Sequence, residues 1–202
     1  LSEFPNAVAH LDAMHRDLVE NIILFSNFAA QSRESDAGPI SPNGSLGPLE
    51  RYDVNVFVSR DEAGGGVPVV EEVHPTLANL VGRVEHRAEA GVLTTSFMLI
   101  KPGALHLANG GYLILDARSL FREPLAWDAL KRSLRQSGVK IESLGEVLNL
   151  STTITLDPEL IPIDLRVILV GDAWMHHVLA AYDPDFSVHF KLLADFETDA
   201  PR

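Results

Sequence analysis

The sequence has 202 residues, of which 46% are hydrophobic, and carries a formal net charge of −12 at pH 7. This length supports one substantial core of ordinary globular composition. The acidic balance, without a basic cluster, argues against a nucleic-acid partner. The absence of cysteine excludes disulfides and thiolate metal sites, and no run approaches the roughly 18 apolar residues that a membrane helix needs. We therefore expect a cytoplasmic protein that binds neither nucleic acid nor membrane.

The first 30 residues have the pattern of one amphipathic helix over residues 2–28. Ser2 and Pro5 are suited to its first turn. Such a helix needs a partner surface, because an isolated helix is marginal in water. Residues 31–50 are rich in Ser, Gly, Pro and Asn, which predicts a flexible linker before an ordered core over residues 51–202. The apolar stripe of the helix consists of Val8, Leu11, Leu18, Ile22 and Phe25.

Two extended segments are predicted at the start of the core. Residues 52–59 alternate as a strand does, and residues 67–73 form a second, shorter extended piece. The glycines at 64–66 indicate a turn between them. No Lys-Ser or Lys-Thr follows these glycines, and the phosphate-binding pattern GxxxxGK[ST] occurs nowhere in the chain.

The chain is organised around ANGGYLILDA, residues 108–117. An apolar run of this length between Gly-Gly and a carboxylate is typical of a strand buried on both faces of a parallel sheet. Ligands bind at the carboxyl ends of such strands, where Asp116 would lie, and a hard cation beside phosphates needs oxygen ligands. The alternative is a core strand that simply ends in a polar residue at a loop.

A helix is predicted over residues 125–136, with one face formed by Trp127, Leu130 and Leu134. Asp128 and Arg132 are spaced to pair one turn apart, and Gly138 would end the helix.

The remaining elements complete an α/β pattern. Residues 139–144 and 152–156 are predicted to form a hairpin, residues 164–171 a buried strand, and residues 173–182 a helix. Strands that alternate with helices favour a largely parallel sheet flanked by helices, with an antiparallel addition.

One long ordered string in this region resembles a known family. The pieces PT..NL.GR.EHRA, IKPGALH.ANGGYL.LDA, IESLGE, IPIDLRVILVGD, AYDPDF and ADFE are similar to the AAA+ ATPase module of Lon-like proteases. The resemblance is to the subgroup with a long helical insertion in the ATPase domain, and it covers most of residues 51–202. It implies an AAA+ fold, with residues 1–30 as the end of the helical insertion.

The resemblance assigns a nucleotide site. Asp116 matches the Walker B aspartate, which holds Mg²⁺ through water beside the phosphates of ATP. Asp172 matches the sensor-1 position, where a carboxylate can hydrogen-bond the attacking water but repels the terminal phosphate. Active members have a glutamate after the Walker B aspartate, and this chain has Ala117. The cofactors implied are therefore ATP and Mg²⁺ in the parent protein, and none in this fragment.

The resemblance also places a pore loop over residues 87–96. Its centre is Gly91, Val92, Leu93 and Thr94, and apolar side chains on such a loop can grip an extended polypeptide. The alternative from the residues alone is an ordinary hairpin whose apolar side chains face the core.

An arginine finger, which completes a neighbouring subunit's site, is expected just before a strand predicted over residues 190–196. No arginine is found there, and the nearest cations are Lys191 and Arg202. The family assembles such sites in a homo-hexameric ring.

Two functions follow as alternatives. In one, the chain is a fragment of an ATP-dependent serine protease that unfolds protein substrates and translocates them to a peptidase domain. In the other, it is a non-hydrolysing AAA+ scaffold that oligomerises and gates substrate access. The phosphate loop and the Ser-Lys peptidase site are absent from these residues, so the fragment itself is expected to be inactive.

Overall fold

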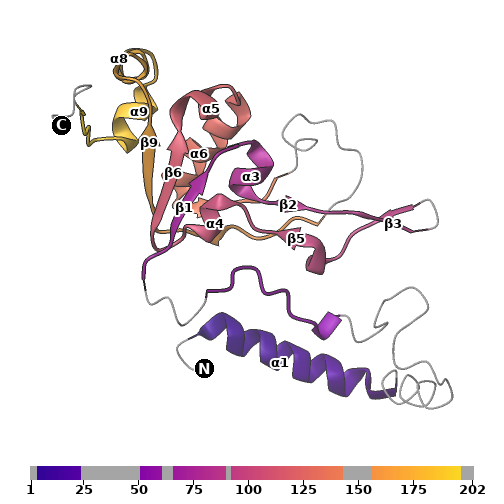
Figure 1. Ribbon diagram of the computed structural model, residues 1–202. Coiled ribbons are helices and arrows are strands. Elements are labelled where there is room, and N and C mark those ends of the chain that lie inside the picture. Colours follow the sequence, from indigo (N-terminus) through magenta and orange to yellow (C-terminus); the bar gives the residue numbers. More distant parts are fainter. Residues whose placement is uncertain (1–3, 24–50, 61–65, 90–91, 143–155, 197–202) are drawn as a thin grey trace. The chain divides into compact units, whose positions relative to one another are not determined.

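The computed structural model describes residues 4–23, 51–60, 66–89, 92–142 and 156–196 (Figure 1). The chain divides into two units, Leu1–Asn55 and Val56–Arg202. Within the described ranges, no helix combines the length and the apolar character that crossing a membrane requires.

The first unit contains helix α1, Pro5–Glu20. Pro5 occupies the first turn, as predicted, but the residue that caps the helix is Phe4, which makes no side-chain capping bond. Ser2 and residues 24–28 of the predicted helix lie outside the described residues. The Asp17 carboxylate accepts hydrogen bonds from the Tyr52 hydroxyl and from Arg51, and the bond from Tyr52 is the main cause that lowers the pKa of Asp17.

The second unit is built on a parallel sheet with the strand order β1-β6-β9. The strands are β1, Val69–Glu72; β6, Tyr112–Asp116; and β9, Arg166–Val170. In the register, Leu113 lies opposite Val70 on one side and Val167 on the other. All three strands fall inside segments that the sequence predicted as extended.

The two faces of this sheet differ. Leu113 and Leu115 are fully buried in the helix-covered face. The opposite face exposes apolar side chains on all three strands, including 41% of Tyr112 and 56% of Val170. The prediction that β6 and β9 are buried on both faces is therefore wrong, because within the described residues helices cover only one of them.

The described residues of this unit form six α-helices and one 3-10 helix, Phe97–Leu99. Helix α6 packs against α3 and α5, α5 also packs against β6 of the sheet, and α4 packs on α3 and β1. Leu80, Leu105, Leu120 and Leu130 contribute fully buried side chains to the core. The helices are α3, Leu77–Val81; α4, Ala104–Leu107; α5, Ala117–Phe121; α6, Pro124–Gln136; α8, Ala173–Tyr182; and α9, Pro184–His189.

Helix α6 confirms the predicted amphipathic face, since Trp127 and Leu130 are buried. The predicted Asp128–Arg132 pair is wrong. Asp128 instead pairs with Lys131 at 3.4 Å, and Arg132 reaches Glu142 at 2.6 Å. The helix ends at Gln136, as predicted, but the left-handed residue that follows it is Ser137, with φ of 49°, and not Gly138.

The predicted hairpin between residues 139–144 and 152–156 is replaced by a different pairing. Strand β7, Gly138–Val139, pairs antiparallel with β8, Ile161–Pro162. Residues 143–155 lie outside the described residues. Local alternation predicted the first strand but not its partner, which comes from farther along the chain.

The strands predicted over residues 52–59 and 190–196 are wrong. Residues 53–60 and 190–196 form neither helix nor strand. Two of their aromatic residues make ring contacts instead: Phe57 lies edge-on to His106 at 4.8 Å, and Phe190 stacks near Phe186 at 5.2 Å between ring centroids. Other apolar residues of these segments, among them Val54, Val56 and Leu192, are exposed. Alternation alone does not make a strand when no neighbouring strand pairs with it.

A two-part antiparallel arm projects from the sheet (Figure 1). Its root pairs β2, Arg83–Val84, with β5, Ile100–Lys101, and its outer part pairs β3, Arg87–Glu89, with β4, Val92–Thr94. At the root, the backbones of Gly82 and Gly103 approach so closely that a β-carbon on Gly103 would lie 2.4 Å from the Gly82 nitrogen.

Candidate functional site

The two carboxylates of the predicted nucleotide site lie at the same end of the parallel sheet. Asp116 is the last residue of β6 and pairs in register with Val170, the last residue of β9. Asp172 follows two residues after Val170 and precedes the first residue of α8. The carboxyl ends of neighbouring parallel strands thus bring the two side chains to one edge, where open α/β sheets bind ligands.

Asp116 is held as the N-cap of α5. One carboxylate oxygen accepts a hydrogen bond from the Ser119 backbone N–H at 2.7 Å. The bonds from Ser119 lower the pKa of Asp116, so the side chain is an anion at neutral pH. Asp116 is exposed, so its carboxylate is accessible at this edge. An exposed anionic oxygen suits a hydrated, hard cation such as Mg²⁺.

Ala117, which follows Asp116, is buried at this edge. It is only 4% exposed, and a β-carbon on Gly171 would lie 2.9 Å from the Ala117 Cβ. The side-chain position therefore faces the start of the loop after β9 in a tightly packed contact. A glutamate would not fit there without displacing this backbone.

Asp172 forms an ion pair that the sequence analysis missed. The guanidinium of Arg118 lies 2.7 Å from the Asp172 carboxylate, and both side chains are more than 60% exposed. An exposed pair of this kind contributes little to stability. Its chemical effect is to offset the negative charge of Asp172. The signal in the sequence was an arginine two residues after the strand end, which places it at the same edge.

The predicted pore loop lies on the projecting arm. Val92, Leu93 and Thr94 form β4, and Thr94 pairs in register with Arg87 of β3. Gly91 lies outside the described residues. The segment is a hairpin. Both interpretations of these residues, a pore loop and an ordinary hairpin with apolar side chains facing the core, are compatible with this arrangement.

Of the two arginine-finger candidates, the structure describes Lys191 alone. Lys191 is exposed in the irregular segment after α9. Arg202 lies outside the described residues. Their role remains a prediction.

The parallel sheet, its flanking helices and the shared carboxyl end define an α/β domain of the AAA type. Residues 65–197 match the family model described as "LonB-like, AAA domain". This match covers more than half of the chain, so the chain belongs to this family, and the resemblance found in the sequence is confirmed.

One curated relative extends this finding. A protein of Escherichia coli (strain K12), described as "Putative Lon protease homolog", is 34% identical over 73 residues. The alignment covers 36% of this chain and 12% of the relative. The aligned part of the chain thus spans about an eighth of the length of this relative.

Proposed function

We propose that this chain belongs to the ATPase module of a Lon-like ATP-dependent serine protease of the cytoplasm. In this proposal the full-length protein binds ATP with Mg²⁺, assembles as a homo-hexameric ring, and passes unfolded protein substrates to a peptidase domain. The observation that carries the proposal is the placement of Asp116 and Asp172 at one carboxyl edge of a parallel sheet in a LonB-like AAA domain.

Each residue at the edge has a defined task in this proposal. Asp116 would hold Mg²⁺ through water, and the ion, when bound, would draw charge from the phosphates. Asp172 would accept a hydrogen bond from the attacking water. Arg118, 2.7 Å from Asp172, offsets the repulsion between that carboxylate and the terminal phosphate.

The arm provides the proposed contact with substrate. Val92, Leu93 and Thr94, with Gly91, would line the pore and grip an extended polypeptide. The projection of the β3–β4 hairpin away from the sheet supports this role, because a loop must leave the core to reach a translocating chain (Figure 1). Lys191 and Arg202 remain the proposed cations for a neighbouring subunit's site.

The 202-residue chain by itself is proposed not to hydrolyse ATP. Its sequence contains no GxxxxGK[ST] loop, whose backbone N–H groups cradle the phosphates. Millimolar Mg-ATP should therefore leave its melting temperature unchanged, because a ligand stabilises a protein only in proportion to its binding. A clear thermal shift would contradict this part of the proposal.

A second function, a non-hydrolysing scaffold that oligomerises and gates substrate access, is favoured by one observation. The Ala117 side chain is apolar and buried against Gly171, so position 117 offers no group to orient an attacking water.

ATP turnover by the full-length protein separates the two functions. In the motor, Asp116→Asn should lower turnover by about tenfold or more, because the anionic ligand of the magnesium shell is lost. The matched control is Asp164→Asn. The Asp164 side chain is 87% exposed and lies near the amino end of β9, away from Asp116, so this variant should leave turnover unchanged. No turnover in the unmodified protein would contradict the motor, and turnover that Asp116→Asn abolishes would contradict the scaffold.

A further inference from the structure

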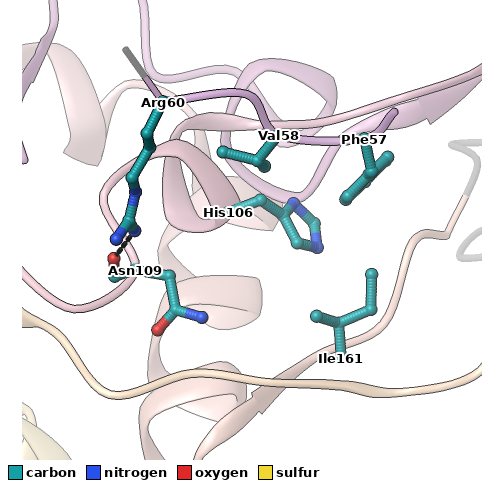
Figure 2. Close-up of a pocket in the computed structure, with 6 residues that line it drawn as sticks. All are labelled: Phe57, Val58, Arg60, His106, Asn109 and Ile161. Atoms are coloured by element: carbon teal, nitrogen blue, oxygen red, sulfur yellow. Dashed lines mark hydrogen bonds between the residues drawn. The ribbon is translucent and has the colours of Figure 1, made fainter. Parts of the chain in front are cut away.

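A pocket of about 350 Å³ lies at the amino end of the parallel sheet, at the opposite end of β6 from Asp116. Figure 2 shows its lining side chains, which come from residues 57–60, from α4, from the turn before β6, and from β8. Its volume is within the range of small-molecule sites. The lining residues are Phe57, Val58, Arg60, His106, Asn109 and Ile161.

His106 is the most unusual group in this pocket. Its side chain is only 3% exposed, and its Nδ1 accepts a hydrogen bond from the Gly103 N–H at 3.2 Å. Burial lowers the pKa of His106 to about 4, so the ring is neutral at pH 7 and carries its proton on Nε2. This Nε2–H is buried, and no group among the described residues accepts a hydrogen bond from it. In Figure 2 the ring extends into the space between Phe57 and Ile161.

The other polar groups of the pocket differ in how far they are satisfied. Both ends of the Asn109 amide are engaged, by the Pro162 carbonyl at 3.2 Å and the Asp164 N–H at 2.8 Å. The Arg60 guanidinium donates to the Asn109 carbonyl oxygen. Among the described residues it makes no ion pair, so its remaining N–H groups and its charge are available to a ligand.

The two groups of the pocket that can still bind a ligand, the Arg60 guanidinium and the His106 Nε2–H, are therefore both hydrogen-bond donors. Arg60 is exposed and marks the mouth of the pocket, whereas His106 is buried in its wall. Phe57, Val58 and Ile161 supply apolar surface between them (Figure 2). A matching ligand has an anion at one end, an apolar body, and a separate neutral acceptor for the His106 N–H, because burying a second anion beside a neutral ring would be costly.

We propose that this pocket binds an N-acylated apolar amino acid with a free carboxylate. The carboxylate pairs with Arg60, the acyl carbonyl accepts the His106 Nε2–H with a small movement of the ring, and the branched side chain contacts Phe57, Val58 and Ile161. The same chemistry occurs in a free N-acyl amino acid and in the last residue of a polypeptide. The proposal does not depend on the nucleotide site, which lies at the other end of the sheet.

The test is an NMR titration of the full 202-residue chain with N-acetyl-leucine. The methyl signals of Val58 and Ile161 and the His106 Nε2–H signal should shift and saturate at millimolar ligand. N-acetyl-leucinamide, which lacks the carboxylate, and the variant Arg60→Gln should each weaken binding by about tenfold or more. The matched control Arg122→Gln removes an exposed arginine outside the pocket and should leave the affinity unchanged.

A peptide that ends in leucine distinguishes the two sources of the ligand. Tighter binding of the peptide than of N-acetyl-leucine supports a polypeptide chain end, and binding of N-acetyl-leucine alone supports a free small molecule. The proposal is overturned if none of the three signals saturates below about 10 mM ligand. It is also overturned if the amide and Arg60→Gln bind as well as the carboxylate and the unmodified chain. A nucleotide titration is not involved, so failure here leaves the proposed ATPase role intact.

Discussion

The two ends of the parallel sheet carry different kinds of site. At the carboxyl end, Asp116, Arg118 and Asp172 are exposed charged groups held by short local contacts. At the amino end, His106 is buried in the wall of a pocket with an unused donor. Exposed groups can be exchanged at little cost in stability, whereas a buried polar group couples its chemistry to folding. Substitutions at the two ends should therefore differ in their effect on the free energy of unfolding.

The largest effect on the free energy of unfolding is expected from Ala117→Glu. This substitution tests whether the buried Ala117 is closely packed, in contrast to the exposed charged side chains at the same end of the sheet. A glutamate there meets Gly171 and loses its hydration, so the free energy of unfolding should fall by about 3 kcal/mol. Urea denaturation measures this change. The matched control is Ala173→Glu, because Ala173 is exposed in the first turn of α8 and should change stability by about 0.5 kcal/mol or less. Equal losses in both variants would contradict the packing described for Ala117.

A pH effect of intermediate size is expected at the amino end. The pKa of His106 is lowered to about 4 in the folded state, below the ordinary value of 6.5, so between these values the unfolded chain binds more protons. Stability should therefore fall as the pH drops from 6.5 to 4.5, and His106 should account for about 2 kcal/mol of that fall.

The variant His106→Gln isolates this contribution. Glutamine at the third helical position can still accept the Gly103 N–H but does not titrate. Chemical denaturation at pH 7 and 4.5 should show a flatter pH dependence for His106→Gln than for the unmodified chain. The exposed His177 provides the control, and His177→Gln should retain the original pH dependence. An unchanged slope in His106→Gln would show that the ring is not buried as described.

The smallest effect on stability is expected from Asp116→Asn. Asparagine caps a helix about as well as aspartate, so at pH 7 the free energy of unfolding should fall by only about 0.3 kcal/mol. The pKa of Asp116 is lower in the folded state than its ordinary value. The ionised carboxylate therefore stabilises the fold above the ordinary pKa, and this stabilisation is lost as the pH falls through the folded-state pKa. The difference between the two proteins should thus disappear below about pH 4. A larger loss at pH 7 would mean that this variant cannot separate magnesium binding from folding.

The sequence predicted the elements whose signal is local. Strands β6 and β9 and helices α6 and α8 were found within a few residues, because apolar runs and helical periodicity report burial directly. The strands over 52–59 and 190–196 were wrong, and the partner of β7 was missed, because pairing depends on which distant segment lies alongside.

The candidate site was predicted to a similar extent. Asp116 and Asp172 were expected at one edge, since both follow apolar strands of a parallel sheet. The Arg118 ion pair and the burial of Ala117 were not predicted, because side-chain direction after a strand end depends on the cap geometry. No functional role was predicted for His106. It lies in the string IKPGALH that carries the family resemblance, among the apolar residues Ala104, Leu105 and Ala108, a pattern that also fits an ordinary core histidine.

The glycine contact at the root of the arm has a practical consequence. A side chain at Gly103 would overlap main-chain atoms of Leu80 and Gly82. The root of the arm is therefore held by a close contact between backbone segments. Beyond it, β3 and β4 make their main contacts with each other. A fluorophore attached at Thr94 would therefore report on whatever touches the outer arm while leaving the folded body unperturbed.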